Sequence, residues 1–229
     1  PEAPNFFLVK KDFDGGNENG LFQVDKLFGL YNSGLTTEFD ELVVQDTKSS
    51  CIQLLENLQT KNSQEIGSIY QIGQEKIGKI ENALKDVNSN NPIVKAIYYR
   101  PFDHKFTIYT GKSNGIMGRP RNDLMKHFSK DNLAVVIGRQ GQAVGSMPWN
   151  VLTITNTIVD CNVFYRGRGT VFPLYVYPDT TAQQTIQHGT APEGNRTPNL
   201  NMDIVNQIAE RLGIPFVAEK SPSLKSVSE

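Results

Sequence analysis

The chain has 229 residues, 38% of them hydrophobic, and a net charge of −1, so it can form one large domain or two lobes with a real core. No apolar run approaches the roughly 20 residues that a membrane-spanning helix needs, and the first residues lack the basic and apolar regions of a signal peptide. Cys51 and Cys161 are isolated, which argues against a metal cluster or a disulfide framework. We expect a soluble, cytoplasmic protein without a membrane partner.

The first 90 residues are expected to form one lobe, in which short strands precede helices. An apolar run at 6–9 predicts a strand, 14–20 a loop and 35–44 an extended hairpin region. Apolar residues at three-residue steps over 52–58, behind a Thr47/Ser49 start, predict a helix.

Helical spacing continues from Ile66 to Leu84 in spite of three glycines, each of which costs a helix roughly 1 kcal/mol relative to alanine. The segment 88–92, which ends in Pro92, then breaks the pattern. It sets the expected boundary between the first lobe, 1–90, and the second, 91–218.

The second lobe is expected to be rich in strands, because β-branched and aromatic residues dominate several short runs. These runs are 94–99, 106–110, 133–138, 151–158 and 174–177. One helix interrupts them: Pro120 fits its first turn, and Leu124, Met125 and Phe128 supply its apolar stripe.

The last part of the chain predicts a mobile loop over 179–198, a helix over 202–212 and a disordered tail over 219–229. The helix should turn Ile204, Val205, Ile208 and Leu212 inward and stop at Gly213. Antiparallel strands with segregated helices predict an α+β fold, a helical N-terminal lobe packed on a mainly antiparallel sheet lobe.

The segment 91–170 carries eleven Lys and Arg residues against four acids, a net charge of +7, while the flanking segments are acidic. Charge segregated in this way produces a local field even in a nearly neutral molecule. Because amides and aromatic residues are interleaved with the bases, the pattern favours a polyanion as partner.

Several familiar sites are excluded by spacing. Gly111-Lys112-Ser113 ends like a phosphate-binding loop, but Phe106 stands where that pattern needs glycine. The three histidines lie far apart with no His or Cys at ligand spacing, so we expect no metal site. No nucleophile with a neighbouring base stands out.

Asp103 lies between aromatic residues and close to Arg100 and Lys105, which leaves two interpretations open. It can act as a general base, with His104 as its acid-base partner. It can also cap the turn that Pro101 makes, with Arg100 as its ion-pair partner, and this second interpretation is favoured.

Three arginine-bearing segments can contact nucleic acid, although a solvated loop or helix start is the alternative for each. Guanidinium groups in 118–121 suit phosphates or guanine edges, and 138–142 places an arginine and two glutamines after an apolar strand, as in direct base reading. The segment 166–169 is typical of a phosphate clamp. The DNA-binding candidates are Arg100, Lys105, Arg119, Arg121, Lys126, Arg139, Gln140, Gln142, Arg166 and Arg168, with Arg139 and Gln140 preferred as base readers.

An ordered set of segments closely resembles the C-terminal specificity region of type ISP restriction-modification enzymes and related adenine-methyltransferase fusions. The segments are 27–40 (with Ser33-Gly34 and Thr37-x-x-Asp40), 98–105, 119–121 with 124–128, 132–133, 138–140, 172–178 and 198–200. The resemblance covers roughly residues 5 to 215. His104-Lys105 departs from the usual pattern, in which an acid or polar residue precedes arginine.

The resemblance implies that this chain, which opens with Pro1, is a piece of a long polypeptide with nuclease, helicase-like ATPase and methyltransferase modules. The parent would use S-adenosylmethionine, ATP and Mg²⁺, and this part would use no cofactor, because it lacks the methyltransferase tetrapeptide and a helicase phosphate loop. Its expected partners are double-stranded DNA and the methyltransferase module of the same parent chain.

Three functions therefore compete. The first is a sequence-specific double-stranded DNA-recognition domain, non-catalytic in isolation, whose Lys and Arg hold phosphates while Arg, Gln and Asn read bases. The second is a small enzyme acting on an anionic or phosphorylated substrate through Asp103 and His104. The third is a protein-interaction module whose basic strip binds an acidic partner.

Overall fold

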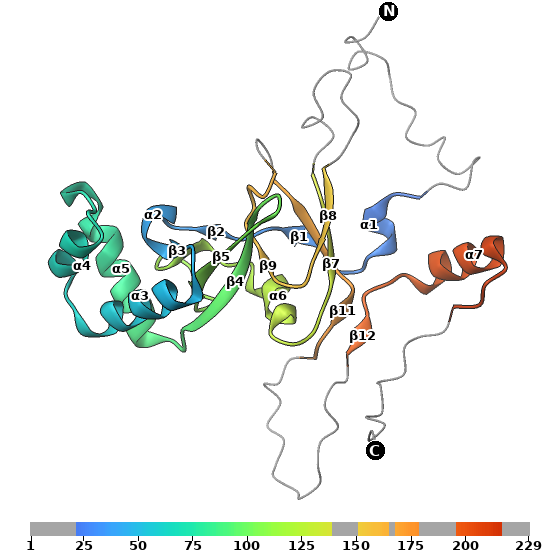
Figure 1. Cartoon of the computed structure of the whole chain (residues 1–229). Coiled ribbons are helices and arrows are strands. Elements are labelled where there is room, and N and C mark those ends of the chain that lie inside the picture. The colour runs from blue at the N-terminus through green and yellow to red at the C-terminus, as the bar shows by residue number, and fades with distance from the viewer. Residues whose placement is uncertain (1–21, 139–150, 165–167, 179–195, 217–229) are drawn as a thin grey trace, which may run out of the picture.

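The computed structural model describes residues 22–138, 151–164, 168–178 and 196–216. Helices gather at one end of an elongated molecule, sheets fill its middle, and a last helix lies at the other end (Figure 1). The strands of these sheets are mostly antiparallel, so the predicted α+β fold is confirmed.

The helical end consists of α3 (Lys48–Thr60), α4 (Ser63–Ile69) and α5 (Ile77–Ser89). Thr47 caps α3 by accepting from the Ser50 backbone N–H, as its position in the sequence predicts. The helical spacing from 66 to 84 does not give one helix. Gln71 adopts a positive φ of 54° after α4, and a 3-10 turn at Gln74–Lys76 precedes α5.

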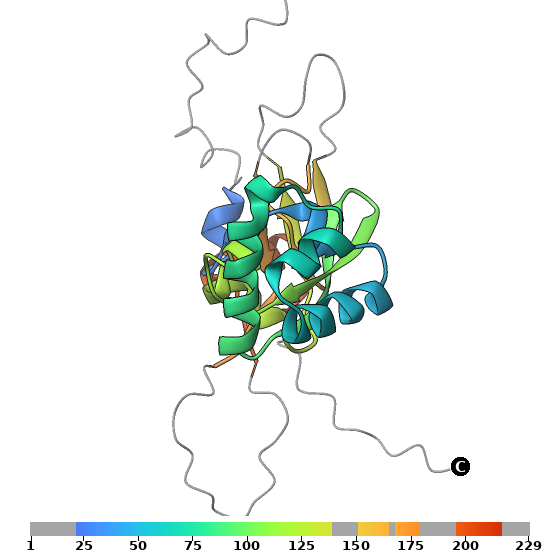
Figure 2. The ribbon, with the colours of Figure 1, turned by 90° about the vertical axis from the view of Figure 1, so that its left-hand side faces the viewer.

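The first sheet has the order β3 (Val44–Gln45), β5 (Asp103–Tyr109), β4 (Ile93–Arg100), β9 (Ile158–Val159). Its pairs are antiparallel except β4 with β9, which run parallel. Viewed from the helical end, α3 and α5 lie in front of the sheets (Figure 2). Buried side chains of α3 and of β4 and β5 belong to the same apolar core.

The second sheet has the order β1 (Asn32–Ser33), β10 (Thr170–Pro173), β7 (Ala134–Ile137), β8 (Leu152–Thr155), all antiparallel. Two short ribbons pair β2 (Thr36–Thr37) with β6 (Met117–Arg119) and β11 (Tyr175–Val176) with β12 (Thr197–Pro198). The remaining helices are α1 (Val24–Leu27), α2 (Asp40–Val43), α6 (Asn122–Met125), which continues into a 3-10 turn at Lys126–Phe128, and α7 (Met202–Leu212).

One apolar core runs from Leu35 to Val171 and joins both sheets to the helices. Strands from either side of residue 90 pair with each other, since β3 pairs with β5 and β1 with β10. The junction between α5 and β4 is therefore a change from helix to strand inside a shared core.

Some expected elements differ from those found. The segment 35–44 is no hairpin, because α2 separates β2 from β3, and β8 and β9 are separate strands where one was expected over 151–158. Pro120 precedes the N-cap of α6 and lies outside its first turn. The residues at 197–198, expected in a loop, form β12.

Helix α7 begins and ends where the sequence predicts, with Gly213 at its C-cap in the left-handed region. Of the four residues expected to point inward, only Val205 is buried, and Leu212 is 65% exposed. The expectations for 6–9, 14–20, most of 179–198 and 219–229 fall outside the described residues.

Candidate nucleic-acid interface

The turn between β4 and β5 is held by a network of charged and aromatic side chains. The Arg100 guanidinium donates to the Asp160 carboxylate at 2.9 Å and lies 3.8 Å from Asp40. It also stacks on the Tyr99 ring, 3.7 Å from its centroid, and the Tyr99 hydroxyl donates to Asp40 at 2.6 Å. Arg100 is thus engaged within the protein. The expected pairing of Arg100 with Asp103 is wrong.

Asp160 is almost fully buried, with 4% of its side chain exposed. Burial raises its pKa from 3.8 to about 6, against the lowering effect of the Asn162 backbone N–H and of Arg100. The Tyr99 pKa rises to about 12, first because of burial and then because its hydroxyl donates to Asp40. The network therefore holds the partly buried Arg100 guanidinium against the Asp160 carboxyl group, which burial makes costly to ionise.

Gly34 lets the chain pass close to Asp160. A Cβ at this position would lie 2.7 Å from the Asp160 carbonyl and from the Cys161 nitrogen, where no side chain fits. Three residues farther on, the Thr37 hydroxyl donates to the same Asp40 carboxylate that accepts a hydrogen bond from the Tyr99 hydroxyl. Two segments that carry the family resemblance, 27–40 and 98–105, thus meet at Asp40.

The first residues of β5 do not form a catalytic pair. Asp103 and His104 are consecutive in a strand, so their side chains leave opposite faces. Asp103 lies 3.8 Å from the Lys105 ammonium, while the His104 ring packs on Tyr98 with centroids 4.8 Å apart. This geometry contradicts the alternative interpretation, in which the two residues act as acid-base partners.

Lys105 is bound to carboxylates as well. Its ammonium donates to Asp46, and this hydrogen bond, together with the charges of Asp46 and Asp103, raises the Lys105 pKa. Lys95 donates to the Phe128 carbonyl at 2.9 Å, and burial lowers its pKa. Both lysines are therefore held in place by the protein.

Three of the predicted arginines that the structure describes make no ion pair or side-chain hydrogen bond with other described residues. Arg119 lies at the end of β6, opposite Thr36. Arg121 combines a left-handed backbone, φ 50°, with a buried Nε that no acceptor satisfies. Arg168 precedes Gly169, whose backbone N–H donates to the Cys161 carbonyl at 2.9 Å. Arg119 and Arg168 are exposed and Arg121 is partly exposed, so these side chains are accessible to an external anion except at the buried Arg121 Nε.

Arg100 and Arg168 lie at the same edge of the two sheets. Arg100 donates to Asp160, and the next residue, Cys161, accepts from the Gly169 N–H. Thr170, which follows Gly169, lies opposite Ile137 at the end of β7. The ends of β7 and β8 reach this upper edge, together with the turn between β4 and β5 (Figure 1). Arg139, Gln140, Gln142 and Arg166 fall outside the described residues, but the described residues that flank them belong to this edge.

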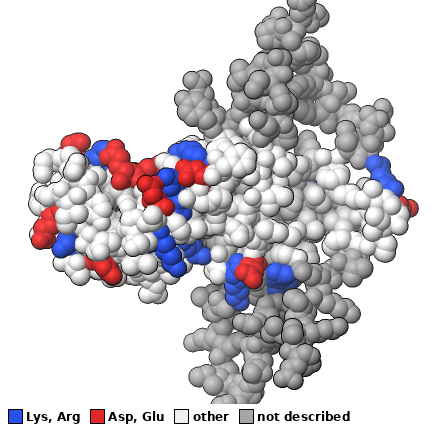
Figure 3. Space-filling model, in the orientation of Figure 1, with Lys and Arg blue, Asp and Glu red and all other residues white. Residues whose placement is uncertain are grey.

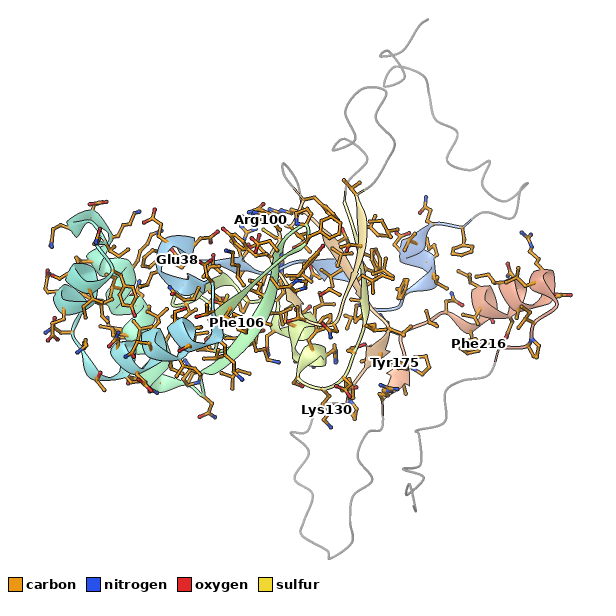
Figure 4. All side chains as sticks on the ribbon, viewed as in Figure 1. Glu38, Arg100, Phe106, Lys130, Tyr175 and Phe216 are labelled. Atoms are coloured by element: carbon orange, nitrogen blue, oxygen red, sulfur yellow. The ribbon has the colours of Figure 1, made fainter. Side chains whose placement is uncertain are left out.

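Lys126 lies at the opposite, lower edge of the molecule. Its 3-10 turn is tied to the start of β4 through Lys95 and to the residue after β11, since the Tyr177 N–H donates to His127 Nδ1 at 3.1 Å. Figure 4 shows Arg100 at the upper edge and Lys130 at the lower edge. On the face drawn in Figure 3, Lys and Arg are mixed with acids where the helices meet the sheets and again at the lower edge. The described bases thus form at least two groups.

The lower edge also contains a feature that the sequence did not predict. An open groove of about 690 Å³ is lined by Lys130, Asn132, Tyr175 and Arg196, among others. The Arg196 guanidinium lies 3.9 Å from the centroid of the Tyr175 ring. Tyr175 and Tyr177 are two residues apart, a spacing that predicts two aromatic rings on one face of a strand. Arg196 gave no such signal, because the segment 179–198 was expected to form a loop.

Two asparagines from the resembling segments serve the scaffold. Asn199 accepts from the Leu30 N–H and donates to the Leu30 and Pro173 carbonyls, at 2.7 to 2.8 Å. The Asn132 amide donates to the Tyr175 carbonyl at 2.8 Å and accepts from the Tyr175 N–H at 3.1 Å. It also donates to the His127 carbonyl. Both amides replace strand hydrogen bonds between segments far apart in sequence.

Within the described ranges, no group of three or more His, Cys, Asp or Glu residues is placed to hold a metal ion. In the same part of the chain, no helix is long and apolar enough to cross a membrane. Both cysteines are free and buried, and burial raises the Cys51 pKa to about 12.

A family model, the Type ISP C-terminal specificity domain, matches residues 26–225. The chain belongs to this family. No curated protein matches it in sequence.

Solved structures similar to the chain include a DrdV–DNA complex determined by cryoEM, with 13% identity over 84% of this chain and a TM-score of 0.47. Two Type ISP restriction-modification enzymes follow, each over 79% of this chain. LlaBIII bound to DNA has 15% identity and a TM-score of 0.49, and a nuclease-deletion mutant of LlaGI with a DNA substrate mimic has 13% and 0.46. The chain spans 18%, 12% and 14% of these three chains.

Proposed function

We propose that the chain is the DNA target-recognition module of a Type ISP restriction-modification enzyme and is non-catalytic by itself. The observation that carries the proposal is the match of the specificity-domain family to residues 26–225. The position of Arg168 and of the ends of β7 and β8 at one edge supports it, because a duplex needs its contacts on a common surface.

The charge distribution supports a division of labour within this module. Arg100 and Lys105 are held by carboxylates and would shape the edge, while Arg119, Arg121 and Arg168 would contact phosphates. Arg139, Gln140 and Gln142 are proposed as base readers on the strength of their residue types alone. Lys126 would bind the backbone of DNA that extends past the lower end.

The methyltransferase module of the same polypeptide is the proposed protein partner, and the cytoplasm the proposed location. S-adenosylmethionine, ATP and Mg²⁺ would be bound by the other modules, with none bound by this chain. The proposal assigns this chain only the choice of target.

Selection from a pool of randomised duplexes by the full-length protein tests the proposal. One short sequence should be enriched. Arg139→Ala or Gln140→Ala should relax the preference at single positions, each at a cost of about 1 to 3 kcal/mol, whereas Lys126→Ala should weaken all sequences alike. Failure of the wild-type protein to enrich any sequence would rule out target recognition. Uniform weakening by all three substitutions, with an unchanged preference, would end the assignment of Arg139 and Gln140 as base readers.

A further inference from the structure

Phe102 has two properties that rarely occur together. It is 97% exposed, the highest fraction of any large apolar side chain in the described residues. Its backbone has a φ of +62°, a conformation that suits glycine or asparagine and strains a bulky residue. A turn selected only for folding would therefore hold a glycine or asparagine here, so the aromatic ring must be explained by something outside the fold.

The turn that presents Phe102 is fixed from below. The Phe102 N–H donates to the Tyr98 hydroxyl at 3.3 Å, and this hydroxyl is also 3.2 Å from that of Thr153 in the second sheet. The Tyr98 ring packs on His104 across the hairpin, and Arg100 is pinned to Asp160. The ring thus projects into solvent from a rigid base, which is what an inserted side chain requires.

The surroundings of the turn favour nucleic acid over protein as the partner. Its exposed acids are already bound, Asp103 to Lys105 and Asp40 to Arg100, so they oppose a phosphate backbone only weakly. The same edge holds the exposed Arg168, two residues before Thr170, and the paired ends of β7 and β8.

We propose that Phe102 is a wedge that enters a groove of the bound duplex and stacks against an opened base step. Apolar side chains inserted between base steps unstack and kink DNA, and the surrounding cationic contacts compensate for the cost of unstacking. The inference rests on the proposed function, since it names a contact that the recognition module makes with its target.

The test uses the full-length protein and the duplex that it enriches, with 2-aminopurine placed at each adenine position in turn. Wild-type protein should raise the fluorescence at one step, because 2-aminopurine brightens when it is unstacked. Phe102→Gly should abolish this rise and weaken binding about 5- to 150-fold, while Phe102→Trp should retain both. Ile69→Ala, which removes another exposed apolar side chain at the far helical end, is the matched control and should change neither.

Stability separates a wedge from a structural residue. Because glycine relieves the positive φ, Phe102→Gly should melt at the same temperature as wild type or higher. A lower melting temperature with unchanged DNA binding would assign the ring to the fold. Normal unstacking by Phe102→Gly, together with loss of contact between this chain and its neighbouring module in cross-linking, would assign it to a protein interface. If no duplex is enriched by wild type, the proposed function fails; if one is enriched and no step brightens, the wedge alone fails.

Discussion

The Arg100 guanidinium and the Asp160 carboxylate lie 2.9 Å apart although 60 residues separate them in sequence. Asp103, directly opposite Arg100 in the strand register, is not its partner. The parallel pairing of β9 with β4 brings Asp160 beneath the hairpin, and Gly34 admits the close approach of the chain behind it. The edge that carries the proposed DNA contacts is therefore built from three distant segments.

Asp160→Asn should alter how stability depends on pH. The folded-state pKa of Asp160, about 6, lies above its ordinary value of 3.8, so the folded protein binds this proton more tightly than the unfolded chain does. The stabilisation is complete below pH 3.8 and is lost as the pH rises through 6. Relative to Asp160→Asn, the wild-type unfolding free energy should fall by about 3 kcal/mol across this window, as measured by urea denaturation.

Asn156→Ala is the control for this titration, because it removes no ionisable group and Asn156 is exposed. Its curve should run parallel to that of wild type between pH 4 and 6. A parallel curve for Asp160→Asn as well would mean that the Asp160 carboxyl titrates normally in the folded protein.

Gly34→Ala should destabilise the fold. The added methyl group would meet backbone atoms of Asp160 and Cys161 at 2.7 Å, and backbone cannot move aside as a flexible side chain can. We expect a loss of about 3 kcal/mol in the unfolding free energy. In contrast, Gly78→Ala adds its methyl group to helix α5 with no atom within 4 Å and should stabilise by up to about 1 kcal/mol. Equal effects of the two substitutions would contradict the close packing at Gly34.

Asn199→Ala should cost about 2 to 4 kcal/mol in the unfolding free energy, because it leaves the buried Pro173 carbonyl and the partly buried Leu30 N–H and carbonyl without partners. Asn156→Ala, at an exposed position, should change stability by no more than about 0.5 kcal/mol. Thermal melting of both variants provides the comparison. A loss for Asn199→Ala as small as that for Asn156→Ala would show that water replaces the amide.

Local signals predicted the elements whose ends are marked by side chains. Helix α3 begins after Thr47, and α7 ends at Gly213, because a cap and a left-handed glycine act within a few residues. Tertiary packing decided the rest. Val44 and Gln45 form a strand because β5 offers them an edge, and Thr170 to Pro173 because β7 and β1 flank them. Neither partner is visible in a local window.

The candidate site was predictable by residue type and only partly by arrangement. Excess charge over 91–170 identified the cations, but burial and carboxylates from elsewhere decided which of them are engaged, as at Arg100 and Lys105. Phe102 lies in a segment whose charged residues attract attention in the sequence, whereas the importance of Phe102 depends on its exposure and on its backbone φ. The sequence does not specify either quantity directly.

Cations without a partner should contribute more to DNA affinity than those that the protein already holds. Arg121 and Arg168 make no ion pair or side-chain hydrogen bond with other described residues, whereas Lys95 donates to the Phe128 carbonyl and its pKa is lowered by burial. Each phosphate contact releases counterions, so the logarithm of the binding constant falls with that of the salt concentration by about one unit of slope per contact. For the full-length protein and its enriched duplex, Arg121→Ala and Arg168→Ala should each lower the slope by about one unit. Lys95→Met, which keeps the length of the side chain, should leave it unchanged.

Fluorescence anisotropy at several salt concentrations measures these slopes. A fall for Lys95→Met equal to that for Arg168→Ala would overturn the distinction between cations that the protein holds and cations that are available to DNA.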